Sequence, residues 1–66
     1  MCVILIVDKV KPSLETLEDC EGSNPDGGGI AWVENERVCF VKGLPAESIF
    51  RISQEIPIPQ IIHFRV

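Results

Sequence analysis

The chain begins Met1-Cys2-Val3-Ile4-Leu5-Ile6-Val7, in which six apolar residues follow the initiator methionine without a polar interruption. A run this short and this apolar is typical of a β-strand that is covered on both faces, and not of one side of an amphipathic helix. We therefore predict a strand over residues 1–7, with cover on both faces, and expect the rest of the fold to be arranged around it.

The same stretch contains a candidate nucleophile. Cys2 becomes the N-terminal residue once Met1 is removed, and a small side chain at the second position permits that cleavage. The mature chain then carries a thiol and a free α-amine on one residue. Such a pair is a nucleophile with its own base, which is the arrangement of N-terminal nucleophile enzymes.

Length and charge restrict the classes of partner. A chain of 66 residues forms at most one small domain, which buries only about 60% of its unfolded surface. A net charge of −4 with only six lysines and arginines argues against nucleic acid or an anionic membrane as partner. The apolar start is too short to span a membrane and lacks the basic head of a signal peptide. We expect a soluble, cytoplasmic protein.

The cysteines do not form a metal or disulfide pattern. Cys2, Cys20 and Cys39 are odd in number and widely spaced, and His63 is the single histidine. A zinc site needs about four nitrogen or sulfur ligands at closer spacing, and a disulfide scaffold has a denser, even set. We expect no metal and no cofactor, and we expect Cys20 and Cys39 to be small buried apolar residues.

The remaining chain alternates between helix and strand patterns. We predict helices over 12–21 and 45–56, and strands over 30–33, 38–41 and 60–66. Gly22 is expected to end the first helix, and Gly43 to end the strand pattern before the second. The turn over 34–37 makes the two middle strands an antiparallel hairpin. The order therefore predicts an α+β sheet with two helices, not a doubly wound fold.

A glycine-rich loop over residues 23–29 precedes the hairpin. A phosphate-binding loop requires a helix directly after the glycines, whereas a strand follows here, and Asp26 would repel a phosphate. We therefore do not expect nucleotide binding. The glycines instead allow a close approach of the backbone to a ligand or another strand.

The chain ends in His63-Phe64-Arg65-Val66. One interpretation of Arg65 is a solvent-exposed residue on an edge strand, which is the usual environment of arginine. The other is a clamp for a substrate carboxylate, because the planar guanidinium binds both carboxylate oxygens at once. If the last strand is antiparallel to the first, Arg65 falls opposite Cys2.

Three segments together resemble the start of the class II glutamine amidotransferases, which are N-terminal nucleophile hydrolases. They are Met1-Cys2 with its apolar strand, Asn24-Pro25-Asp26-Gly27-Gly28-Gly29-Ile30-Ala31-Trp32, and His63-Phe64-Arg65. The resemblance implies a four-layer αββα sandwich, of which this chain would be the N-terminal part. It also implies that glutamine is the substrate.

The resemblance also implies roles for particular residues. Cys2 would attack the side-chain amide of glutamine to give a glutamyl thioester and ammonia, with its own α-amine as proton acceptor. Arg65 would hold the α-carboxylate of glutamine, and His63 would orient the last strand. Asp26, Gly27 and Gly28 would form a supporting loop beside the nucleophile.

The family takes its oxyanion hole from an Asn-Gly pair that lies beyond the arginine motif, and residues 1–66 contain no such pair. We therefore expect residues 1–66 to be a single, incomplete glutamine amidotransferase-like domain, catalytic only when the remainder is in place.

Three other interpretations remain open. The chain could be a non-catalytic interaction module that forms a homo-oligomer through an open sheet edge. It could be an unrelated small α+β binding domain in which Cys2 is only a buried thiol. It could also belong to an N-terminal nucleophile hydrolase that acts on a different amide.

Overall fold

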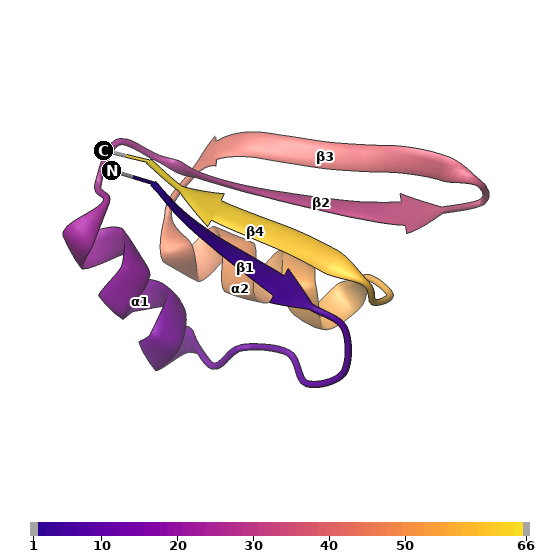
Figure 1. Cartoon of the computed structure of the whole chain (residues 1–66), viewed down its shortest axis with the longest axis horizontal. Coiled ribbons are helices and arrows are strands. Elements are labelled where there is room, and N and C mark those ends of the chain that lie inside the picture. Colours follow the sequence, from indigo (N-terminus) through magenta and orange to yellow (C-terminus); the bar gives the residue numbers. More distant parts are fainter. Residues whose placement is uncertain (1, 66) are drawn as a thin grey trace.

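The last strand of the chain lies between the first and the second, so the start of the first strand and the end of the last lie side by side (Figure 1). The computed structural model describes residues 2–65. Their elements in chain order are β1 (Val3–Val7), α1 (Leu14–Ser23), β2 (Gly28–Glu34), β3 (Arg37–Leu44), α2 (Ala46–Glu55) and β4 (Gln60–Phe64). The sheet order is β1-β4-β2-β3, and every neighbouring pair is antiparallel. The expected α+β sheet with two helices is confirmed.

The first residue of the predicted first strand and the last residue of the predicted last strand fall outside this range. Met1, whose removal the expected chemistry requires, and Val66, placed at the end of the last strand, are outside the described residues. The other predicted elements are present with shifted bounds. All six elements lie in the expected order along residues 2–65.

Local signals account for the helices. The hydroxyl of Ser13 accepts a hydrogen bond from the Thr16 backbone N–H at 3.2 Å and caps α1. Pro45 caps α2 without a side-chain bond, and the carboxylate of Glu21 instead accepts from the Ala46 N–H at 2.9 Å. Within residues 2–65, no helix is long and apolar enough to cross a membrane.

Two predicted element ends are wrong. Gly22 does not end α1, which continues to Ser23 and closes with the Asn24 N–H bonded to carbonyl oxygens of the last turn. Gly43 does not end the hairpin, because its φ of +78° lets β3 pass a register shift and continue to Leu44.

The hairpin turn has two residues. Asn35 and Glu36 both have positive φ, 52° and 62°, which is the geometry of a type I′ turn. This turn sets the pairing of β2 with β3, beginning at Glu34 and Arg37. Both strands are longer than the sequence pattern predicts.

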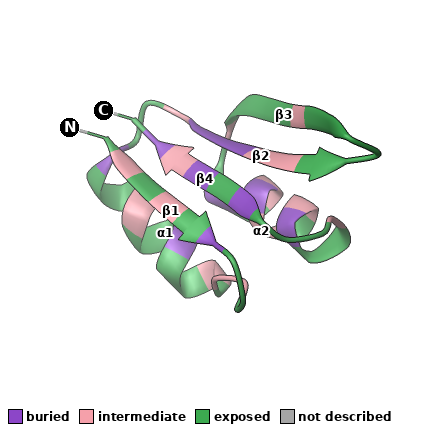
Figure 2. Cartoon of the chain, turned by 45° about the vertical axis from the view of Figure 1, so that its right-hand side comes forward, coloured by how far each residue is buried: buried purple, intermediate pink, exposed green. Residues whose placement is uncertain are grey.

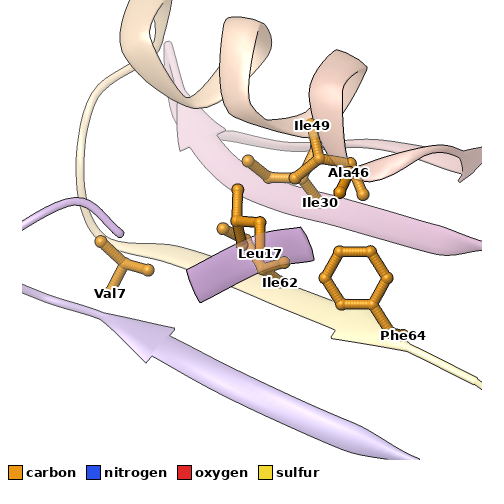
Figure 3. Close-up of a cluster of buried hydrophobic side chains, with 7 residues drawn as sticks. All are labelled: Val7, Leu17, Ile30, Ala46, Ile49, Ile62 and Phe64. Carbon is orange, nitrogen blue, oxygen red and sulfur yellow. The ribbon is translucent and has the colours of Figure 1, made fainter. Parts of the chain in front are cut away.

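Both helices pack on one face of the sheet, where the core lies (Figures 1 and 3). The buried apolar side chains of the core come from three strands and both helices. They are Val7, Leu17, Ile30, Ala46, Ile49, Ile62 and Phe64. Figure 3 shows the Ile62 and Phe64 side chains of β4 beside Leu17 and below Ile49. Of the isoleucines that repeat at helical spacing along the second helix, Ile49 is a core residue, whereas Ile52 and Ile56 are half-buried and pack against the core.

A buried polar pair joins β4 to α2. The Ser53 hydroxyl donates to Gln60 Oε1 at 2.7 Å, and Gln60 Nε2 donates to the Ser53 carbonyl oxygen at 3.1 Å. Both residues are fully buried, so their polar groups form hydrogen bonds with each other where water has no access. Lys11 Nζ donates to the Ile56 carbonyl oxygen at 2.9 Å and closes the same end of α2.

The prediction that the first strand is covered on both faces is wrong for the single chain. β1 lies at an edge of the sheet, and exposed positions alternate along it with less exposed ones (Figure 2). The exposed positions are Ile4 and Ile6, on the face away from the helices. The physical reason is that both helices cover the same side. Cys20 and Cys39, which were expected to be buried, are only half-buried.

The burial pattern around the end of β1 generates a stability prediction. Val7 is 4% exposed in the core, whereas Val10 is 85% exposed in the following loop. Val7→Ala should lower the free energy of unfolding by about 1.5–3 kcal/mol, because it removes buried apolar surface and leaves a cavity. Val10→Ala should change it by less than about 0.5 kcal/mol. Urea titration of both variants measures this, and equal losses would contradict the placement of the core.

Candidate functional site

The three segments singled out in the sequence meet at one end of the sheet. Phe64 is the Cα partner of Val3 on one side and of Gly28 on the other. The next residues outward from this row are Cys2, Arg65 and Gly27. The antiparallel pairing of β1 with β4 thus meets the condition under which Arg65 falls opposite Cys2.

Two backbone hydrogen bonds fix the glycine-rich loop to the end of β4. The Asp26 N–H donates to the Arg65 carbonyl oxygen at 2.8 Å, and the Arg65 N–H donates to the Gly27 carbonyl oxygen at 3.1 Å. The backbone of Arg65 is therefore held on the loop side while its side chain is exposed. A φ of +119° at Gly27 allows the chain to turn into β2 at this point.

A cavity of about 420 Å³ opens beside these bonds. It is lined by Asp26, Gly27, Gly28, Lys42, Gly43, His63 and Arg65. Two of the lining side chains, Lys42 and Arg65, are basic and one, Asp26, is acidic, in a chain whose net charge is −4. Among residues 2–65 the one ion pair joins Glu47 and Arg51, so no ion pair engages Lys42 or Arg65 there. The cavity can therefore receive a small carboxylate.

Two glycines allow the close packing that shapes this cavity. A Cβ on Gly28 would lie 2.5 Å from Ile49 Cδ1 and 2.6 Å from Phe64 Cε1. A Cβ on Gly29 would overlap Nε2 of His63, whose ring lies directly across from that glycine. Gly28 and Gly29 also belong to β2, so the loop ends earlier than the sequence pattern predicts.

Cys2 lies at the neighbouring strand end and not in the cavity lining. It is exposed and free of any disulfide, and it directly precedes β1. The cavity and the thiol are therefore adjacent positions along the same end of the sheet. Of the expected site residues, the structure brings Asp26, Gly27, Gly28 and Arg65 to one cavity.

Lys42 is the charged lining residue that the sequence analysis did not predict. It pairs with Gly29 across β2 and β3, which carries its side chain to the same face as His63. A signal for it exists in the sequence. Counting residue pairs back from a two-residue turn at Asn35 and Glu36 places Lys42 opposite Gly29.

A larger hollow of about 520 Å³ lies at the other end of the sheet, beside the hairpin turn. It is lined by Trp32, Glu34, Asn35, Arg37 and Cys39. Trp32 Nε1 already donates to Glu34 Oε1 at 3.0 Å, and the charged groups there are of opposite sign. Of the three segments singled out in the sequence, only the residue Trp32 lines this hollow.

No protein-family model matches the chain, and comparisons with curated proteins and with solved structures also find no significant match. Within residues 2–65, no cluster of three or more His, Cys, Asp or Glu side chains has the arrangement of a metal site.

The tight packing at Gly28 can be tested with a matched glycine. Gly28→Ala should destabilise the fold by about 1–3 kcal/mol, because the Phe64 ring has to move away from the new methyl group. Gly22→Ala places a methyl group in open space on α1 and should stabilise by about 0.5 kcal/mol. Thermal or urea unfolding measures both. A Gly28→Ala protein that is as stable as the unmodified chain would contradict the close contact.

Proposed function

We propose that this chain is the N-terminal part of a class II glutamine amidotransferase, with Cys2 as nucleophile and Arg65 as ligand of the substrate α-carboxylate. The observation that carries the proposal is the strand register. It puts the residue before β1 and the residue after β4 side by side at one end of the sheet. The glycine-rich loop is bonded to the second of these residues.

The chemistry follows from the N-terminal position of Cys2. After removal of Met1, Sγ attacks the side-chain amide carbon of glutamine while the α-amine accepts the thiol proton. That proton passes to the amide nitrogen, and the C–N bond breaks to release ammonia and leave a glutamyl thioester. Water then cleaves the thioester to give glutamate and restore the thiol.

Substrate orientation would come from the charged cavity. Arg65 offers a planar pair of donors to the α-carboxylate, and Lys42 and His63 add donors on the same side. Asp26 is a candidate ligand for the α-ammonium group of glutamine, because it lines the same cavity with the opposite charge. In this proposal Gly27 and Gly28 support the loop and make no direct contact with the substrate.

The layers of the fold agree with this family. One sheet with both helices on one face corresponds to half of an αββα sandwich, in which a second sheet covers the other face. Donors for the oxyanion of the tetrahedral intermediate would come from outside residues 1–66. Loss of one such donor typically costs 100- to 1000-fold in rate, so we propose that this chain alone hydrolyses glutamine slowly at best.

Selective labelling tests the nucleophile without requiring turnover. A glutamine analogue carrying a chloroketone in place of the side-chain amide should add once to the chain, at Cys2, after loss of Met1. Cys20 and Cys39 are half-buried and serve as internal controls. Intact mass and peptide mapping measure the adduct, and Cys2→Ala should abolish it. Labelling of Cys20 or Cys39 at the same rate as Cys2, or no labelling of a chain that lacks Met1, would contradict the proposal.

The carboxylate clamp has its own readout. Arg65→Ala should slow labelling by the glutamine analogue about tenfold or more, because the α-carboxylate loses a charged partner. Labelling by iodoacetamide, which carries no carboxylate, should keep its rate. Arg37→Ala, at the exposed hairpin end, is the matched control and should leave both rates unchanged. Equal slowing with both reagents would show that Arg65 acts on the fold and not on the substrate.

A further inference from the structure

The face of the sheet away from the helices is apolar across all four strands. Its central row runs Ile6, Ile61, Ala31, Phe40, each the Cα partner of the next. Residues that are directly paired across strands point to the same side of a sheet. We call this the open face, and it also includes Ile4, Val33 and Val38.

The open face is larger than a soluble single chain usually exposes. Six of its large side chains, Ile4, Ile6, Val33, Val38, Phe40 and Ile61, are between 47% and 73% exposed. Together they expose on the order of 700 Å² of apolar surface, above the roughly 300–600 Å² typical of the largest patch on a monomer. A standard protein interface buries about 800 Å² per partner, so the face has the size of one.

Its shape provides both a hollow and a protrusion. A groove of about 260 Å³ runs through the face, lined almost entirely by apolar atoms. Its lining residues are Ile6, Ala31, Trp32, Val33, Val38, Pro59, Gln60 and Ile61. Phe40 is exposed beside this groove and does not line it. A surface that carries both features can pack against a copy of itself.

The charge distribution favours a second copy as the occupant. Six of the ten acidic residues lie on α1 and α2, on the opposite side of the sheet. The central row has no charged side chain, and Lys42 and His63 lie toward the site end. Two copies packed through their open faces therefore keep both acidic helix layers outward and far apart, where repulsion between like charges is small.

We propose that two copies of this chain associate through their open faces, each sheet covering the other. The contact is isologous, as a twofold axis requires, and it stacks the two sheets about 10 Å apart with the helices outside. The dimer has the layer order helices, sheet, sheet, helices. The proposal rests on the open face and the charge distribution, and it concerns the 66-residue chain by itself. In that chain the second copy takes the place that the proposed function gives to a second sheet, and the dimer does not require any reaction at Cys2.

Pairing through a sheet edge would not have the same effect. The edges of the sheet are β1 and β3, and a copy added to either edge extends the sheet while the open face stays in water. Face-to-face packing removes that apolar surface from water, which is the larger gain in free energy.

Sedimentation equilibrium of the 66-residue chain over a range of concentrations tests the proposal. The expected result is a reversible change from the 7.3 kDa chain to twice that mass. Phe40→Glu and Ile61→Glu, made separately, should each weaken the dimer by more than about tenfold, because each places two charges in an apolar contact. Val10→Glu is the control, since Val10 is more exposed than either residue and lies off the sheet.

Circular dichroism checks that the charged variants keep the fold, which is expected because both side chains are exposed in the single chain. A chain that stays at 7.3 kDa at every concentration overturns the proposal. So does a dimer that survives both Phe40→Glu and Ile61→Glu, because such a dimer uses an edge or the helix layer. Loss of the dimer in Val10→Glu would likewise show that the contact is elsewhere.

Discussion

The contact of the Phe64 ring with the bare backbone of Gly28 is the constraint on which the rest of the structure depends. Phe64 is fully buried, and its ring occupies the space that a side chain at Gly28 would need. This contact sits where β4 pairs with β1 on one side and β2 on the other. It therefore sets the order of three strands and brings both ends of the described chain to the same edge of the molecule.

The candidate site is a consequence of that strand order. Phe64 is paired with Val3 on one side and Gly28 on the other. The residues one step farther along the three strands are Arg65, Cys2 and Gly27, so the strand register alone makes these three neighbours. The backbone bonds between the loop and Arg65 then hold the cavity wall in place. A basic cavity in an acidic chain is consistent with a carboxylate ligand, and it gains most of its charge from residues at strand ends.

The one-sided packing of the helices has a different consequence. A chain this small has few side chains to form a core, and both helices are needed on one face to bury seven residues. The other face keeps apolar side chains in its central row, because the strands carry apolar residues on both of their faces. Covering it would add to the stability of the fold by mass action, because only the folded chain presents the surface.

The sequence alone determined the types of element and their order. Apolar runs, a glycine-rich loop and prolines at the ends of the second helix are local features, and local backbone preferences decide them. It also determined which residues carry reactive or charged groups, namely Cys2, Asp26 and Arg65. Only the tertiary structure decided that β4 inserts between β1 and β2, because strand order depends on contacts between residues distant in the chain. For the same reason it alone showed Lys42 beside Arg65, and Ile4 and Ile6 uncovered, since a continuous apolar run does not reveal which of its two faces the helices will cover.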